Sequence, residues 1–249
     1  MAPGFSEEDL ERIEEALREA LTVLSRFTPG EVQSRRKSGD DPVTEADTQV
    51  DSLLRRLLPR EGEGWLSEET TDDLSRLDRR RVWVVDPIDG TRSFIAGYAE
   101  FGISVGLVED GLPVVGVIHN PARSETFWAV RGGGAFLRTG TAAAVRIRVA
   151  EPGEDRPALL ASRSEIRRGE FESFDDHELR ELGSTACKMA GVAAGRGNAF
   201  LSRGPKSEWD VAAGVLIVEE AGGVATDLDG AAVRFNRPDT SVHGILAAA

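Results

Sequence analysis

The chain reads Trp83-Val84-Val85-Asp86-Pro87-Ile88-Asp89-Gly90-Thr91 where an apolar run meets a turn that carries two carboxylates. Residues 82–85 are typical of a buried strand, which Asp86 ends. A proline and a glycine favour a tight turn after it, so the carboxylates of Asp86 and Asp89 can face one ion. Hard divalent cations, magnesium in particular, prefer such oxygen ligands. The same spacing is common in solvated turns, so this stretch alone leaves a metal site undecided.

Two other segments place carboxylates near the ends of predicted elements, and we expect them to converge with the first pair. These segments are Leu66-Ser67-Glu68-Glu69-Thr70 and Glu208-Trp209-Asp210-Val211-Ala212-Ala213-Gly214. Each has a simpler interpretation. Glu68 with its neighbour Glu69 is typical of an exposed surface, and Asp210 can be the N-cap of a helix that ends at Gly222-Gly223.

Two amphipathic helices are predicted before this strand. Ser6 and the three acids after it are typical of a helix start, and apolar residues then recur at helical spacing as far as Leu24. Thr44 can cap a second helix, which Pro59 stops. Asp47 follows Thr44 by three residues and matches the acid of a capping box.

The remainder of the chain divides into two predicted halves. An antiparallel meander is predicted from four apolar runs, at residues 101–108, 114–118, 126–130 and 135–137. Residues 139–157 mix glycine, proline and charge, which indicates a boundary between an N-terminal half, 1–138, and a C-terminal half, 139–249. In the second half, short apolar runs alternate with helical patterns at 185–194 and 211–221, as in an α/β arrangement.

Composition excludes several classes of partner and site. The 249 residues include 43 acids and 30 bases, and the net charge of −13 opposes binding to nucleic acid or to a membrane surface. A single cysteine, Cys187, excludes an internal disulfide and a cysteine-built zinc site. We find no secretory leader and no apolar run of membrane length, so a cytoplasmic location is expected.

Taken together, the acidic segments resemble the inositol monophosphatase superfamily, a group of magnesium-dependent and often lithium-sensitive phosphomonoesterases. Four segments carry the resemblance in the order found in the family, namely residues 41–47 (Asp-Pro-Val-Thr-Glu-Ala-Asp), 67–69, 83–94 and 209–223. The resemblance implies an α/β (α+β) fold, a layered αβαβα sandwich with the site between its halves. It also implies a phosphoric monoester hydrolase, with a homodimer as the default assembly.

The resemblance further implies a role for each acid. Glu68, Asp86 and the carbonyl of Ile88 would hold one Mg²⁺, and Asp86, Asp89 and Asp210 a second, with a third, weaker ion near Glu68 left open. Asp47 and Thr91 match the pair that orients and deprotonates the attacking water, which makes them catalytic candidates together with Glu68. The amides of Gly90 and Thr91 would bind the phosphate. One departure is Ser93, where the family usually has asparagine.

Substrate choice is predicted from the C-terminal half. Inositol-specific members usually carry a glutamate about seven residues before the last aspartate, and residues 201–206 (Leu-Ser-Arg-Gly-Pro-Lys) contain no acid. Other features resemble the 3′(2′),5′-bisphosphate nucleotidases. The candidate substrate-binding residues are Ser162, Ser184, Lys188, Arg203 and Lys206. Lys188 can pair with a second phosphate, although a solvated helix face is an equal alternative for it, as a basic loop is for the last two.

The sequence therefore predicts a magnesium-dependent phosphatase of a small phosphate monoester, with 3′-phosphoadenosine 5′-phosphate favoured. The alternatives are inositol-1-monophosphatase and a histidinol-phosphate or sugar-phosphate phosphatase. A non-catalytic regulator that binds metal or phosphate is an alternative of another class. Such a regulator would not require the pair Asp47 and Thr91.

Overall fold

The computed structural model describes residues 7–36, 42–151, 153 and 156–249. The expected cap Ser6 and the first residue of the 41–47 motif, Asp41, lie outside the described residues. The described N-terminal elements are α1 (Glu7–Leu24), β1 (Ser34–Arg36), β2 (Pro42–Thr44), α2 (Glu45–Leu57), β3 (Gly64–Ser67), the 3-10 turn η1 (Ser75–Asp78), β4 (Arg81–Asp89) and α3 (Thr91–Ile95).

The meander and the C-terminal elements follow. They are β5 (Gly102–Glu109), β6 (Leu112–Asn120), β7 (Glu125–Val130), β8 (Gly134–Thr139), β9 (Val145–Ile147), β10 (Ala158–Ala161), α4 (Arg163–Arg167), β11 (Glu178–Glu181), α5 (Thr185–Ala193), β12 (Ala199–Ser202), β13 (Lys206–Ser207), α6 (Glu208–Glu220), β14 (Val224–Thr226), β15 (Ser241–Val242) and β16 (Ile245–Ala248). Both predicted helices and the four strands of the meander are confirmed. Within the described residues, no helix combines the length and the apolar character that crossing a membrane requires.

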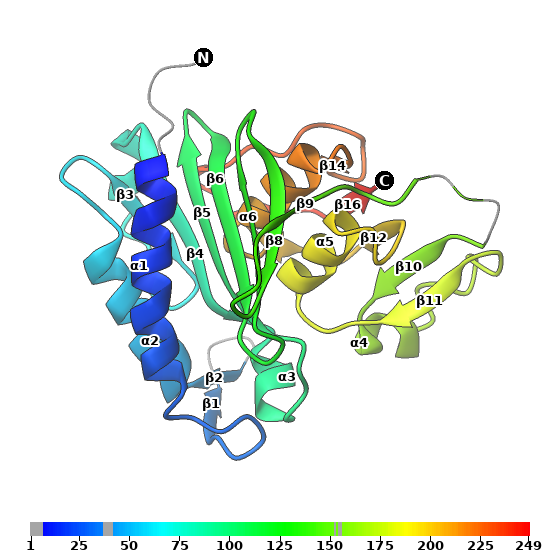
Figure 1. Cartoon of the computed structure of the whole chain (residues 1–249), viewed down its shortest axis with the longest axis horizontal. Helices are drawn as coiled ribbons and strands as arrows, with labels where there is room; N and C mark the ends of the chain where they lie inside the picture. Colours follow the sequence, from blue (N-terminus) through cyan, green and yellow to red (C-terminus); the bar gives the residue numbers. More distant parts are fainter. Residues whose placement is uncertain (1–6, 37–41, 152, 154–155) are drawn as a thin grey trace.

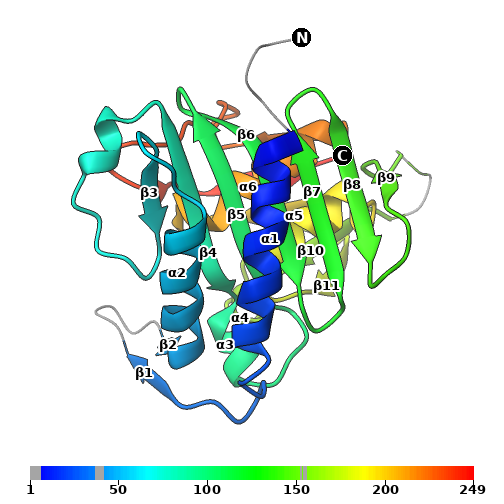
Figure 2. The ribbon, with the colours of Figure 1, turned by 60° about the vertical axis from the view of Figure 1, so that its left-hand side comes forward.

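The elements stack in five layers (Figure 1). Helices α1 and α2 cover one face of a seven-stranded sheet of order β3-β4-β5-β6-β7-β8-β9, and α5 and α6 cover the other. A five-stranded sheet of order β11-β10-β12-β16-β14 lies beyond α5 and α6, with α4 outside it. Figure 2 shows α1 and α2 lying across the large sheet. This stacking confirms the predicted αβαβα sandwich.

Strand β4 is buried on both faces because each face meets a layer of helices. Trp83 and Val85 belong to the apolar cluster shared with α1 and α2, whereas Val82 and Val84 belong to the cluster shared with α5 and α6. This alternation follows from the two-residue period of a strand. A continuous apolar run is what a strand covered on both sides requires.

Helix α6 packs against the sheet at two glycines. A Cβ atom at Gly116 of β6 would lie 2.8 Å from the carbonyl oxygen of Ala213, and one at Gly106 of β5 would lie 3.1 Å from the Cβ atom of Ala212. The small residues on both sides let the helix backbone approach the strands closely. This approach sets the position of the N-terminus of α6, where Asp210 lies.

Three details differ from the sequence-based expectation. Strand β4 does not end at Asp86 but continues to Asp89, with an irregular register between the two. Helix α6 starts at Glu208, so its N-cap is Ser207 and Asp210 is the acid of a capping box rather than the cap itself. The large sheet also extends past residue 138, because β9 pairs with β8.

We predict that Gly116→Ala lowers the free energy of unfolding by about 2 kcal/mol, because the added methyl group overpacks the contact between β6 and α6. Urea denaturation measures the change. Gly204→Ala is the matched control, since nothing lies within 4 Å of a Cβ atom at that position. An equal loss of stability in both variants would show that the close approach of α6 is not the cause.

Candidate active site

The irregular end of β4 presents two acids to one cleft. Asp86 and Asp89 are 2% and 7% exposed, and the carboxylate of Asp86 accepts a hydrogen bond from the amide of Ile88 at 3.0 Å. Gly90 follows with a φ of +94° and is the N-cap of α3. A Cβ atom there would lie 2.9 Å from the carbonyl oxygen of Glu100. Both the left-handed backbone and the lack of space therefore require glycine in this turn.

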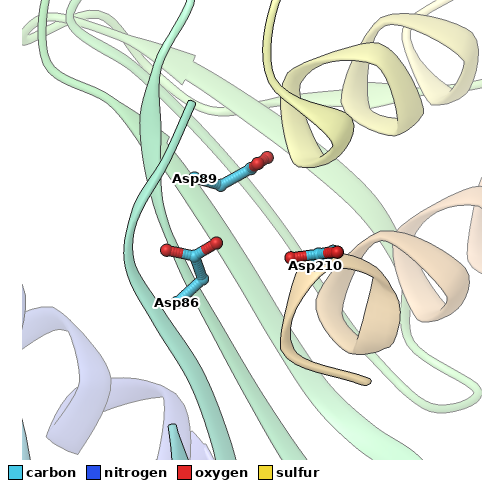
Figure 3. Close-up of side chains that lie close together, drawn as sticks. All are labelled: Asp86, Asp89 and Asp210. Atoms are coloured by element: carbon cyan, nitrogen blue, oxygen red, sulfur yellow. The ribbon is translucent and has the colours of Figure 1, made fainter. Parts of the chain in front are cut away.

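Asp210 joins these two acids from the opposite wall of the cleft (Figure 3). Oxygen atoms of Asp86, Asp89 and Asp210 all lie within 4.8 Å of one another. Asp210 is held in place because its Oδ2 atom accepts a hydrogen bond of 2.8 Å from the amide of Ser207. Glu68, just after β3, lines the same cleft. The structure thus brings the four predicted acids into one cleft, three of them at metal-ligand spacing.

The electrostatics of this cluster suit a bound cation. Burial, followed by repulsion from Glu68, Asp89 and Asp210, raises the pKa of Asp86 well above its usual value. Burial and the charge of Asp89 raise the pKa of Asp210 to about 7. Carboxylates crowded in this way resist ionisation unless positive charge offsets their repulsion. Oxygen donors at this spacing fit a hard divalent ion such as Mg²⁺.

Asp89 also anchors a helix, which the sequence did not indicate. Its Oδ2 atom accepts a hydrogen bond of 2.5 Å from the hydroxyl of Ser184, and its Oδ1 atom accepts one of 3.2 Å from the amide of Thr185. The amide of Ala186 also donates to this carboxylate. Ser184 is the N-cap of α5. The negative charge of Asp89 therefore lies where the dipole of α5 favours it, and Figure 3 shows its carboxylate directed toward this helix.

Asp47 has both of the roles considered for it. Its Oδ2 atom accepts a hydrogen bond of 2.8 Å from the amide of Thr44, which completes the capping box of α2. Its Oδ1 atom accepts a hydrogen bond of 3.0 Å from the hydroxyl of Thr91. The hydroxyl of Thr91 is also 3.0 Å from the carbonyl oxygen of Ile88, so two acceptors share one proton. Burial raises the pKa of Asp47.

The wall of the cleft beside α4 and α5 is positively charged. The cleft has a volume of about 900 Å³, and its lining includes Arg163, Arg167, Arg168, Lys188 and Lys206. The three arginines did not figure among the predicted site residues. The spacing of two of them could have indicated a shared surface, because Arg163 and Arg167 are four residues apart and lie on one face of a helix. Ser162 and Ser184 line the same cleft as N-caps of α4 and α5.

Lys188 is buried, so the alternative of a solvated helix face is wrong. Its side chain is on α5, the residue is 3% exposed, and its Nζ atom lies 4.9 Å above the ring of Phe200. Burial lowers the pKa of this ammonium group to about 8. Among the described residues, no side chain or carbonyl group forms a hydrogen bond or ion pair with it.

Arg203 is placed elsewhere. It is exposed, donates a hydrogen bond to the carbonyl oxygen of Glu170 and lies over the ring of Phe174. These contacts hold its guanidinium outside the group of residues that line the cleft. The sequence-based assignment of Arg203 to the substrate is therefore not supported by its position, whereas Lys206 does line the cleft.

Comparisons with known proteins agree with this architecture. The model of the inositol monophosphatase family matches residues 6–249. An inositol-1-monophosphatase of Mesorhizobium japonicum is 36% identical over 216 residues, which cover 81% of this chain and 79% of the relative. A histidinol-phosphatase of Mycobacterium tuberculosis is 34% identical over 246 residues, 93% of this chain and 92% of the relative.

A solved structure is similar over nearly the full length. The crystal structure of CysQ from Bacteroides thetaiotaomicron, a bacterial member of the inositol monophosphatase family, has a TM-score of 0.82 and 27% sequence identity. The match covers 98% of both chains. The sandwich, the acidic cluster and these matches lead to one conclusion. The chain belongs to the inositol monophosphatase family and is a phosphoric monoester hydrolase.

Proposed function

We propose that the protein hydrolyses a small phosphate monoester with Mg²⁺ held by Glu68, Asp86, Asp89, Asp210 and the carbonyl oxygen of Ile88. The convergence of three carboxylates within 4.8 Å of one another, those of Asp86 and Asp89 buried and that of Asp210 half-buried, carries this proposal. These donors are sufficient to hold two ions, and a third ion can bind near Glu68. The cytoplasmic location, the lithium sensitivity and the homodimer remain predictions from the sequence.

The residues of the chain contribute to the reaction mainly by positioning the attacking water and the phosphate. Magnesium, when bound, lowers the pKa of coordinated water and offsets the charge of the phosphoryl oxygens. Thr91 can orient the attacking water through its hydroxyl oxygen, since its proton is directed to Asp47 or to the Ile88 carbonyl. Asp47, whose pKa is raised by burial, can take up the proton that the water loses. The amides of Gly90 and Thr91 are the proposed donors to the phosphate.

The charge of the cleft supports a substrate with a second anionic group. Lys188 is an ammonium group in a buried site that lacks an ion-pair partner among the described residues, and Lys206 lies close enough to lower its pKa further. Two such cations favour an additional phosphate over the hydroxyl groups of inositol. We therefore propose a nucleoside 3′,5′-bisphosphate, such as 3′-phosphoadenosine 5′-phosphate, as the substrate. Inositol monophosphate and histidinol phosphate are the alternatives that the relatives' names suggest.

Phosphate release from 3′-phosphoadenosine 5′-phosphate and from inositol monophosphate, assayed side by side with Mg²⁺, tests the substrate. We expect Lys188→Met to raise KM for the bisphosphate by about tenfold or more, the value of one charge-assisted hydrogen bond. Hydrolysis of the monophosphate should change far less. Arg203→Met is the control, because it removes a cation outside the cleft. Efficient turnover of inositol monophosphate with negligible bisphosphate turnover would contradict the assignment.

Thr91→Val separates catalysis from metal binding. The variant keeps the shape of the side chain but loses the hydroxyl group, so we expect kcat to fall by about 100-fold or more. Magnesium affinity, measured by calorimetry, should stay close to that of the wild type. Thr48→Val makes the same change on the exposed face of α2 and should leave both quantities unchanged. Full activity in Thr91→Val would exclude the proposed role of its hydroxyl.

The acidic cluster predicts how stability depends on pH without metal. The pKa of Asp210 is about 7 in the folded chain against 3.8 for an ordinary aspartate, so the folded state binds more protons between these values. The free energy of unfolding should therefore fall as pH rises from about 4 to about 7. In EDTA, Asp210→Asn should show a smaller fall than the wild type. Added Mg²⁺ should reduce the difference, and identical pH profiles in EDTA would disprove the effect.

A further inference from the structure

Arg76 is a buried cation that lies outside the cleft. It belongs to η1, in the segment that connects Glu68 to β4, and it is 1% exposed. Its Nε and Nη2 atoms donate to Oδ2 of Asp72 at 3.0 and 2.7 Å. One side of the guanidinium group therefore fixes the segment from which it comes.

The other side reaches a segment 160 residues further along the chain. Its Nη1 atom donates to Oδ1 of Asn236 at 2.8 Å, and its Nη2 atom donates to the carbonyl oxygen of Arg237 at 2.8 Å. Asn236 has a left-handed backbone with φ of +58° and returns a hydrogen bond of 3.3 Å to the carbonyl oxygen of Arg76. The planar fork thus makes four hydrogen bonds, a geometry that lysine cannot reproduce. In Figure 2 the orange-red chain after α6 passes behind the cyan segment after β3.

Asn236 and Arg237 also hold the start of α6 through their backbone amides. The amide of Asn236 donates to Oε2 of Glu208 at 2.7 Å, and the amide of Arg237 donates to Oε1 of Glu208 at 3.1 Å. Glu208 is fully buried and is the first residue of α6, two residues before Asp210. Arg76 is therefore connected to the N-terminus of α6 through the two residues 236 and 237.

We propose that Arg76 is a positioning residue that fixes the N-terminus of α6, and with it Asp210, relative to the segment that carries Glu68. The inference rests on the proposed magnesium site. Glu68 and Asp210 lie on segments that are distant in sequence. The guanidinium group bonds the first segment directly, at Asp72, and reaches the start of α6 through residues 236 and 237, whose amides hold Glu208. Without it, the carbonyl oxygen of Arg237 loses a buried donor and the loop that holds Glu208 loosens. Mutation of residues that orient metal ligands in this way typically lowers metal affinity by about 10-fold to 100-fold.

The test measures Mg²⁺ binding to the full chain by calorimetry, at a temperature well below the melting point of each variant. Arg76→Met should weaken Mg²⁺ binding by about tenfold or more, and Arg76→Lys should restore part of the loss. Hydrogen exchange at the amides of residues 208–212 should become faster in Arg76→Met. Arg79→Met is the matched control, since Arg79 is exposed and its side chain is outside the network.

The outcomes separate positioning from simple stabilisation. A lower melting temperature with unchanged Mg²⁺ affinity and unchanged exchange at 208–212 would overturn the proposal. If Arg76→Met does not fold, Asn236→Gly keeps the left-handed backbone and removes the amide side chain, and it should weaken Mg²⁺ binding to a smaller degree. Unchanged affinity in that variant would then overturn the proposal. A wild-type protein that binds no Mg²⁺ would instead disprove the proposed function.

Discussion

Repulsion between buried carboxylates is the interaction on which the rest of the molecule depends. Oxygen atoms of Asp86, Asp89 and Asp210 come within 4.8 Å of one another, and the raised pKa values of Asp86 and Asp210 show the cost. Such an arrangement is unfavourable for folding unless a cation binds there. The surrounding structure must therefore hold the acids together by other means, and it does so with hydrogen bonds to helix ends and with close packing of α6.

The packing of α6 explains why the acids meet even though they are distant in sequence. Small residues on the helix and glycines on β5 and β6 bring the two backbones together over several residues. Glu208 and Ser207 then fix the first turn of the helix, through the loop at 236–237 and through the capping box. Precise placement of Asp210 is consequently a property of the whole interface between helix and sheet. A preorganised site of this kind requires little rearrangement when a ligand binds.

Much of this could be predicted because the signals were local. The meander followed from alternating apolar runs, and α2 from Thr44, Asp47 and Pro59. The exact start of α6 was missed, because its first turn contains Glu208 and Asp210 and the continuous apolar run begins only at Val211. Lys188 could not be assigned to the interior, since burial of a charged residue depends on tertiary neighbours such as Phe200. The role of Arg76 could not be predicted, because its pairing with Asp72 is local but the partners that connect it to α6 lie about 160 residues away.

The hydrogen bonds between Asp89 and the start of α5 link the two binding events of the proposed reaction. Asp89 is a proposed metal ligand and also the acceptor for three donors at the N-terminus of the helix that carries Lys188. A cation that withdraws electron density from this carboxylate would weaken its hydrogen bonds to α5. A shift of α5 would in turn change the position of the carboxylate that binds the cation. Such coupling is reciprocal by thermodynamic necessity. If the proposed function holds, the affinity of the cleft for metal and its affinity for a second phosphate would therefore not be independent of each other.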